Sequence, residues 1–144
     1  MTDSAFTIRL AHWPKDKDAL KQVREAVFVR EQRVPVELEW DGLDDQCLHM
    51  LAEDHQGTPI GTGRLLPDGH IGRMAVLREW RGRSVGSALL RALMDEGKKR
   101  GFLDLVLAAQ VQAMPFYEKA GFVAEGEVFD DAGIPHRNMV WKNS

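Results

Sequence analysis

Hydrophobic and polar positions form blocks that predict strands and helices in turn. Phe6 to Leu10 alternates apolar and polar residues, which predicts a strand with one buried face. Apolar residues then recur at helical spacing from Leu20 to Val27, so a helix is expected up to about Gln32. Three short strands follow, and the short turns between them favour an antiparallel meander. These strands are expected at 48–53, 59–66 and 70–77.

The second half of the chain starts with another helical stripe, from Val85 to about Gly101. A short helix is expected further on, with Pro115 in its first turn. The strands of this half are expected at 103–109, 122–128 and 134–141. The first of them is almost continuously apolar, as in a strand covered on both faces. This order predicts the α/β (α+β) class in one domain over residues 1–144, with helices on a mixed, mostly antiparallel sheet.

Composition adds an ordinary globular character. The chain has 144 residues, of which 44% are hydrophobic and 28% charged, and its net charge is −3. This weak negative charge gives no reason to expect nucleic acid or an anionic membrane as a partner. Cys47 is the only cysteine, so no internal disulfide is possible, and a small core residue in a cytoplasmic protein is expected. No signal peptide is expected, and no apolar run is long enough for a transmembrane helix.

The stretch from Arg81 to Ser87 has the features of a phosphate-binding loop. It follows a strand and opens a helix, where main-chain N–H groups lack intrahelical acceptors and the helix dipole adds positive charge. Gly82 and Gly86 allow a ligand to approach the main chain closely. Three arginines add charge at this end: Arg78, Arg81 and Arg83. A pyrophosphate fits this pattern; the alternative is an ordinary helix start, capped by Ser84, with solvated arginines.

Two motifs resemble those of the GNAT acetyltransferases. Gly72–Val76 followed by Arg81–Leu90 resembles the acetyl-CoA-binding motif of that family, and Phe116–Phe122 resembles its second hallmark. The helix around Val23–Pro35 and the stretch Gly133–His136 are similar to the ElaA/YjcF-like subgroup. The resemblance covers essentially the whole chain and implies the GNAT acyl-CoA N-acyltransferase fold. It also implies an enzyme that transfers an acetyl group from acetyl-CoA directly to a primary amine.

Two positions depart from the pattern of the family. Ser84 stands where the middle glycine of Arg/Gln-x-x-Gly-x-Gly/Ala is usual; it keeps the N–H donor and adds a hydroxyl and a Cβ. Gln110 stands where many members carry asparagine before the short helix. The effect of each change on the cofactor contacts is left open by the sequence.

The resemblance implies that coenzyme A lies where two neighbouring strands splay apart. The main chain of Met74, Ala75 and Val76 would pair with the pantetheine arm, and an N–H there, aimed by a β-bulge, would polarise the thioester carbonyl. The residues expected to bind the cofactor are Met74, Ala75, Val76, Arg81, Gly82, Arg83, Ser84, Val85, Gly86, Ser87, Gln110 and Phe116. No metal is expected, because the histidines and the single cysteine show no ligand spacing.

The catalytic candidates are Tyr117, His136 and Glu31. Tyr117 is the only tyrosine, and the resemblance implies that its phenol acts as general acid on the departing thiolate; a purely packed ring is the alternative. His136 and Glu31 are expected at the acceptor pocket without an assigned role, and His49 is a further candidate for the base. The acidic stretch 37–45 is either a solvated loop or a lid whose negative field attracts a cationic amine.

Two other functions fit the same motifs. One is a non-catalytic module that binds or senses acyl-CoA, and the other is a phosphate-loop domain for nucleotides. The sequence does not name the acceptor, which is expected to be a small-molecule or peptide amine. Dimers are frequent in the family, so a homodimer is compatible with the sequence, which does not fix the oligomeric state.

Overall fold

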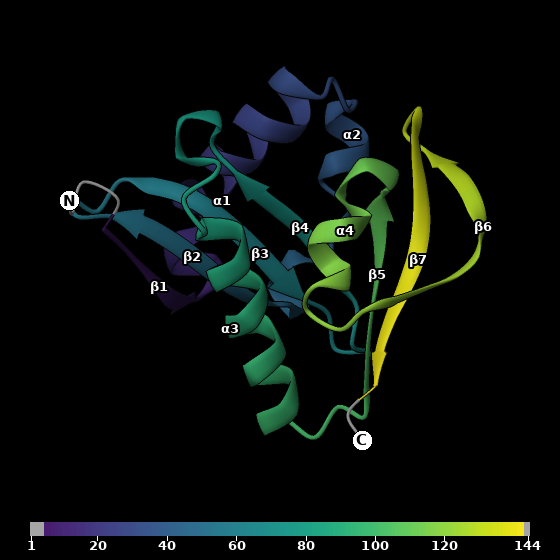
Figure 1. Cartoon of the computed structure of the whole chain (residues 1–144). Helices are drawn as coiled ribbons and strands as arrows, with labels where there is room; N and C mark the ends of the chain where they lie inside the picture. The colour runs from purple at the N-terminus through teal and green to yellow at the C-terminus, as the bar shows by residue number, and fades with distance from the viewer. Residues whose placement is uncertain (1–4, 143–144) are drawn as a thin grey trace.

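The computed structural model describes residues 5–142 and begins with a four-stranded antiparallel sheet (Figure 1). The strands lie side by side in the order of the chain, so the predicted meander is confirmed. Their bounds are Phe6–Ala11 for β1, Leu48–Asp54 for β2, Pro59–Leu65 for β3 and Ile71–Val76 for β4. β4 is the last strand of this sheet, and its outer side faces the rest of the molecule.

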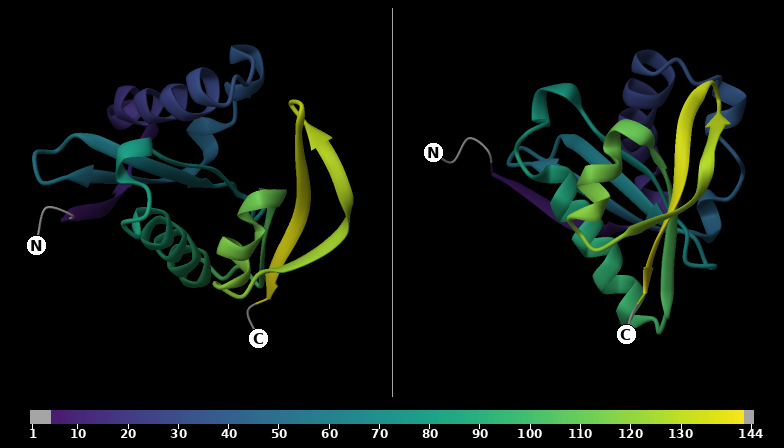
Figure 2. Two further views of the ribbon diagram at one scale, coloured as in Figure 1. Left: turned by 45° about the horizontal axis from the view of Figure 1, so that its top comes forward. Right: turned by 45° about the vertical axis from the view of Figure 1, so that its right-hand side comes forward.

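Helices cover both faces of this sheet (Figure 2, left). On one face lies α1 (Trp13–Arg24), which buries Leu20 and Val23 completely. On the other lies α3 (Val85–Lys99), which buries Leu89 and Leu93 completely. The apolar stripes read from the sequence therefore meet the sheet as expected. None of the helices in residues 5–142 is long and apolar enough to cross a membrane.

The first predicted helix continues past α1 in a different geometry. Glu25–Glu31 forms a π-helical segment, η2, in which Gln32 N donates to Val27 O at 2.9 Å, five residues back. The acidic stretch that follows is partly helical. It contains α2 (Val36–Glu39) and a short 3₁₀ turn, η3 (Asp44–Gln46).

A second sheet of three antiparallel strands forms the other half of the molecule, in the order β5–β7–β6. Its strands are β5 (Asp104–Gln110), β6 (Val123–Asp131) and β7 (Ile134–Lys142), and η5 (Val111–Ala113) and α4 (Met114–Glu118) connect β5 to β6. The prediction that the β5 strand is covered on both faces is wrong. Leu105 and Leu107 are buried, but Val106 between them is only half-buried and Asp104 and Ala108 on either side are exposed, so one face of β5 is open.

The two sheets meet where β4 and β5 begin. Val106 N donates to Gly69 O at 3.0 Å, and His70 and Val106 form a parallel bridge. No ladder joins β4 and β5 beyond this bridge in residues 5–142, and the strands diverge into a V (Figures 1 and 2). The predicted mixed arrangement with parted strands is confirmed, in the form of two sheets fastened at one end.

Candidate functional site

β4 contains a β-bulge on the side that faces β3. A single residue of β3, Gly63, lies opposite Arg73 and Met74 of β4. Arg73 has a φ of 51°, a left-handed conformation that residues other than glycine rarely adopt. The resemblance implied a bulge in this strand, and the register confirms it.

The outer edge of β4 is open toward the diverging space between the sheets. Leu77 N donates to Ile60 O at 2.9 Å, so this end of the strand turns alternate N–H groups toward β3. The N–H groups of Val76 and Met74 therefore point the other way. An extended ligand in the V would meet these groups as an added strand does.

The loop before α3 leads into main-chain donors that have no acceptor within the helix. The first hydrogen bond of the helix in the described chain runs from Ala88 N to Ser84 O, at 3.1 Å. The N–H groups of Val85, Gly86 and Ser87 precede it and have no intrahelical acceptor. Ser84 stands at the N-cap position with a φ of 69°, and its hydroxyl makes no cap hydrogen bond. The left-handed turn at Ser84 therefore aims N–H groups outward, as an anion site requires.

The three arginines of the loop have different roles, and their charge is less concentrated than the sequence predicted. Arg81 donates to both carboxylate oxygens of Glu31, at 2.6 and 2.8 Å, and to Val76 O at 3.0 Å. Arg78 lies 3.8 Å from the same carboxylate. The guanidinium of Arg83 lies 5.0 Å from the ring centre of Trp80. Glu31 thus offsets part of the positive charge, and Arg81 braces the loop.

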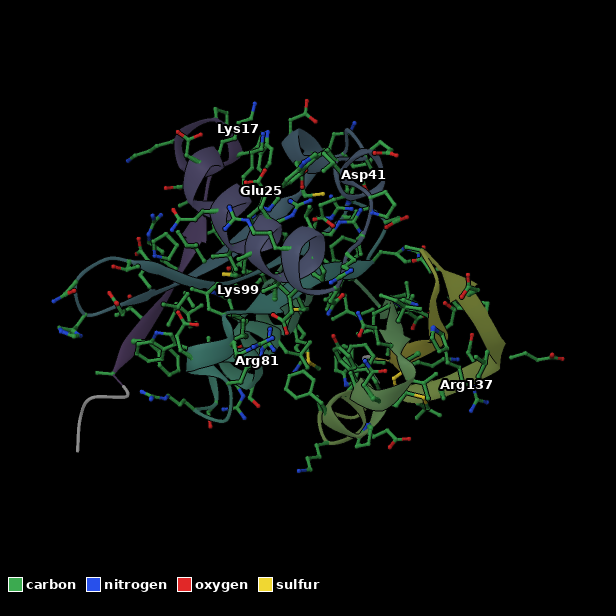
Figure 3. The ribbon with its side chains drawn as sticks, turned by 90° about the horizontal axis from the view of Figure 1, so that it is seen from above. Lys17, Glu25, Asp41, Arg81, Lys99 and Arg137 are labelled. Carbon is green, nitrogen blue, oxygen red and sulfur yellow. The ribbon has the colours of Figure 1, made fainter. Side chains whose placement is uncertain are left out.

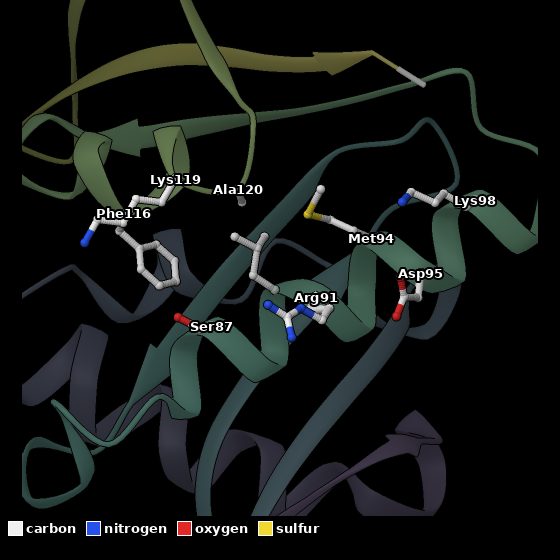
Figure 4. A pocket seen from close by; sticks show the side chains of 9 residues that line it. Ser87, Arg91, Met94, Asp95, Lys98, Phe116, Lys119 and Ala120 are labelled. Atoms are coloured by element: carbon white, nitrogen blue, oxygen red, sulfur yellow. The ribbon is translucent and has the colours of Figure 1, made fainter. Parts of the chain in front are cut away.

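A groove of about 620 Å³ lies between α3 and α4, directly beside this loop (Figure 4). Phe116 forms part of its wall and packs against the start of α3: a Cβ added at Gly86 would lie 3.4 Å from the Phe116 ring. Basic side chains from both helices line the groove: Arg91, Lys98 and Lys119. The groove therefore continues the anion-binding loop with an aromatic ring and positive charges.

Tyr117 follows Phe116 on α4 and packs its ring into the core. Its ring centre is 5.0 Å from that of Phe116 and 6.2 Å from that of Phe122, both in edge-on contacts. Burial raises the pKa of Tyr117 to about 12. The phenol therefore keeps its proton at neutral pH, as a general acid must.

Gln110 connects the two sides of the V at the end of β5. Its Nε2 donates to Gln32 Oε1 at 2.9 Å, and its own Oε1 accepts from Gln112 Nε2 at 2.7 Å. Gln32 lies just after the π-helical segment, so this bond joins the first sheet's helical layer to the second sheet. Sequence reasoning singled out Gln110 but missed Gln32, because no local pattern relates residues 78 positions apart, and it also missed Gln112, two positions away.

The two acceptor-site candidates lie in different surroundings. His136, on β7, is buried and faces Gln110 of β5; its Nδ1 is 2.7 Å from Ile134 O, and Phe129 stacks on its ring at 6.0 Å. Glu31 ends the π-helical segment, where the hydrogen bonds from Arg81 hold its pKa below the ordinary value. A carboxylate with a lowered pKa that accepts two hydrogen bonds from an arginine is a weak base, which favours a positioning role for Glu31.

The acidic stretch is solvated in part, with Glu37 and Asp45 exposed, and paired in part. Three of its carboxylates, Glu39, Asp41 and Asp44, form ion pairs with three arginines from other elements: Arg24, Arg64 and Arg73. Figure 3 shows the side chains around Asp41 gathered beside the first helical layer, apart from the hairpin that carries Arg137. The three arginines offset the charge of these carboxylates, which weakens the negative field that they could offer to a cationic amine.

His49 and Cys47 lie beside this network. His49 is buried, its Nε2 donates to Asp44 O at 2.8 Å and its ring stacks on Trp13, and burial lowers its pKa. These contacts favour packing over a role as the base. Burial raises the pKa of Cys47 to about 11, which leaves the thiol protonated. In residues 5–142 no group of three or more potential ligands is arranged to hold a metal ion.

Comparisons with known proteins agree with this geometry. The family model described as "Acetyltransferase (GNAT) domain" matches residues 16–143. The uncharacterised N-acetyltransferase YjcF of Bacillus subtilis is 40% identical over 133 residues, covering 88% of this chain and 94% of the relative. Among solved structures, an acyl-CoA N-acyltransferase from Pseudomonas aeruginosa has a TM-score of 0.84 at 30% identity, over 95% of this chain and 99% of that one. Escherichia coli ElaA has a TM-score of 0.85 at 28% identity, over 94% and 99%.

The V between two sheets, the bulged strand and the anion-binding loop define an acyltransferase that uses a coenzyme A thioester and an amine acceptor. The chain belongs to the GNAT acetyltransferase family. The likeness to YjcF and ElaA confirms the predicted subgroup.

Proposed function

We propose that this chain, as one domain over residues 1–144, transfers an acetyl group from acetyl-CoA directly to a primary amine of a small molecule or peptide. The observation that carries the proposal is the position of the N–H groups of Val85, Gly86 and Ser87, which have no acceptor within the helix; Ser87 is exposed, whereas Val85 is buried. They lie at the start of α3, beside the strands that part, so one extended thioester can reach both features.

The parts of coenzyme A fit three neighbouring features. The diphosphate fits the loop from Arg81 to Ser87, in which residues 81–84 and Ser87 are exposed and the first N–H groups of α3 have no acceptor within the helix. The pantetheine arm fits the open edge of Met74–Val76. The phosphorylated nucleoside fits the groove beside Phe116, where basic side chains face the ligand. In this arrangement Arg81 acts by holding the loop to β4. Gln110, at the end of β5, would lie near the acyl group in the space between β4 and β5.

The chemistry assigns one task to each group. The amine nitrogen bonds to the thioester carbonyl carbon while the carbon–sulfur bond breaks. A main-chain N–H of β4 donates to the carbonyl oxygen as its negative charge grows. Tyr117 gives its proton to the departing sulfur, and the amine releases a proton to water or to a nearby base. We assign His136 and Glu31 to the acceptor side, where His136 contacts the acceptor and Glu31 fixes the loop.

Release of free thiol from acetyl-CoA in the presence of an amine panel tests the proposal. Stimulation by at least one primary amine, with a product whose mass is increased by one acetyl group, supports direct transfer. A chain that is stabilised by acetyl-CoA but that no amine stimulates would be a sensing module instead. Competition by ATP as strong as that by coenzyme A would favour the nucleotide-binding alternative. The cytoplasmic location and a homodimer stay predictions, which cell fractionation and light scattering address.

A further inference from the structure

Arg73 stands at the bulge of β4 in a costly conformation. Its φ of 51° lies in the left-handed region, where the Cβ of a residue other than glycine crowds the main chain. Such a conformation persists only where the surroundings impose it. The contacts of the Arg73 side chain identify what imposes it.

The guanidinium of Arg73 reaches the acidic segment that follows the π-helical segment. Its Nε lies 3.3 Å from Glu39 Oε2, and its Nη2 lies 3.2 Å from both Glu39 O and Asp41 Oδ2. Two hydrogen-bond acceptors, Glu39 O and Asp41 Oδ2, and the nearby carboxylate of Glu39 therefore hold one planar cation. The side chain is pinned at a segment more than thirty positions away in sequence.

The acidic segment is itself immobilised from two other elements. Arg24 of α1 lies 2.8 Å from Glu39 Oε2 through its Nε, and Arg64 of β3 donates to Asp41 Oδ1 at 3.1 Å. Arg24, Arg64 and Glu39 are all buried. The acceptors of Arg73 are thus fixed to the helix above the sheet and to the strand beside β4.

We propose that Arg73 is a positioning residue that, through Glu39 and Asp41, fixes the bulge and with it the direction of the main-chain N–H groups of Met74 and Val76. This inference rests on the proposed function, because those N–H groups matter only if they meet the pantetheine arm and the thioester carbonyl. The buried ion pairs thereby serve the geometry of the active site.

Three substitutions distinguish the effect of the tether, meaning the contacts of the Arg73 side chain with Glu39 and Asp41, from the effect of the backbone conformation. Arg73→Ala removes the tether and keeps the left-handed strain. Arg73→Gly removes the tether but adopts φ near 51° without strain. Arg9→Ala is the control, since Arg9 also pairs with two carboxylates, Asp16 and Glu53, but lies on β1 at the opposite edge of the sheet.

The first readout is independent of activity: amide chemical shifts of the protein without ligand. The amides of residues 74–76 should move in Arg73→Ala, move less in Arg73→Gly and stay in place in Arg9→Ala. Unmoved amides in a folded Arg73→Ala protein would overturn the proposal. If that variant does not fold, Asp41→Asn replaces it, since it keeps the shape of the side chain and removes one charge from the tether. The same test then applies to its amides.

The second readout is the split between kcat and KM. We expect kcat of Arg73→Ala to fall about 10- to 100-fold, with KM for acetyl-CoA within about threefold, because the misdirected donor acts mainly in the transition state. Arg73→Gly should lie between Arg73→Ala and the unsubstituted protein. A loss confined to acetyl-CoA affinity would contradict the positioning role. If the unsubstituted protein acetylates no amine, the proposed function fails, while the amide shifts still decide whether Arg73 fixes the bulge.

Discussion

Arg81 and Glu31 form a two-point ion pair, with Nη1 and Nη2 at 2.6 and 2.8 Å from the two carboxylate oxygens. The remaining donor of the guanidinium, Nε, binds Val76 O at 3.0 Å. One side chain therefore ties the anion-binding loop to the end of β4 and to the π-helical segment. The loop is positioned before a ligand arrives, which reduces the entropy lost on binding.

Glu31→Gln should weaken coenzyme A binding by loosening this loop. We expect the Kd for coenzyme A to rise about 3- to 10-fold, since one charge-assisted contact is lost without removal of a phosphate donor. Isothermal titration calorimetry measures the change, and Glu37→Gln, on an exposed position of the acidic segment, is the control. Because Arg81 holds the pKa of Glu31 below 4.5, the brace is complete above that pH and is lost as pH falls through the lowered pKa. An unchanged Kd in Glu31→Gln would contradict the brace.

Tyr117→Phe should impair chemistry and spare binding. Removal of the hydroxyl deletes the proposed proton donor, so we expect kcat to fall about 100-fold or more, with the Kd for coenzyme A nearly unchanged. Burial raises the pKa of Tyr117 to about 12, so deprotonation of the phenol should not limit kcat below about pH 10 in the unsubstituted enzyme. The pH profile of kcat and a thermal melt check both points. A fully active, folded Tyr117→Phe protein would leave Tyr117 a packing residue.

Ser84→Gly should stabilise the protein. Ser84 has a φ of 69°, which costs a residue with a Cβ about 1–2 kcal/mol, whereas glycine loses about 0.5–1 kcal/mol more conformational entropy on folding. The difference favours glycine by up to about 1 kcal/mol, or about 2–4 °C in Tm for a chain of this size. Differential scanning calorimetry measures the shift.

The matched control for Ser84→Gly is Arg91→Gly, at an exposed position within α3. Glycine in a helix interior is destabilising by about 0.8–1 kcal/mol relative to the best helix formers, so this variant should melt at a lower temperature. Lower stability in both variants would show that the left-handed turn at Ser84 is not strained.

The free energy of unfolding should fall between pH 4 and pH 2. Burial alone would raise the pKa of Asp41, but Arg64 and the neighbouring main chain outweigh it and hold the pKa at about 2. Because the pKa of Asp41 is lower in the folded than in the unfolded chain, its carboxylate stabilises the fold at any pH above the unfolded pKa of 3.8. As the pH falls from that value to about 2, the carboxylate is protonated and this stabilisation is lost. Asp16 behaves alike, since its bonds to Arg9 and His12 N also hold its pKa at about 2.

Glu39 acts in the opposite direction, because burial raises its pKa despite three nearby arginines. Its protonation therefore adds stability as the pH falls from the raised pKa toward 4.5, above the range in which Asp41 and Asp16 lose theirs. Urea unfolding of the unsubstituted protein and of Asp41→Asn at a series of pH values measures the net effect. The Asp41→Asn curve should be flatter between pH 4 and pH 2; parallel curves would contradict the assignment to Asp41.

The sequence predicted those parts of the site that depend on short segments. The loop around Gly82 and Gly86 could be found because phosphate binding at a helix start requires a few residues in a fixed order. Tyr117 could be found for the same reason, within a short motif after Pro115. Both the element order and the meander followed from periodicity and turn residues.

The remaining features depend on contacts between distant segments. The ion pairs of Arg24 with Glu39 and Asp44 join residues 15 and 20 positions apart, and charged side chains in sequence look solvated until the fold buries them. The apolar residues of β5 suggested two covered faces, yet its pattern of exposure is set by which helices pack on the second sheet. The bond between Gln32 and Gln110 arises only after the two sheets have assembled.

The attachment of the two sheets at His70 and Val106 has a consequence for the size of the group transferred. In the described chain this parallel bridge is the main-chain link between the sheets. The separation of β4 and β5 beyond the bridge is therefore set by side-chain packing and not by a ladder of main-chain hydrogen bonds. We expect substitutions near His70 and Val106 to widen or narrow this separation while both sheets keep their hydrogen bonds. For the proposed acyltransferase, we therefore expect that the acceptable length of the acyl chain can change through such substitutions without loss of either sheet.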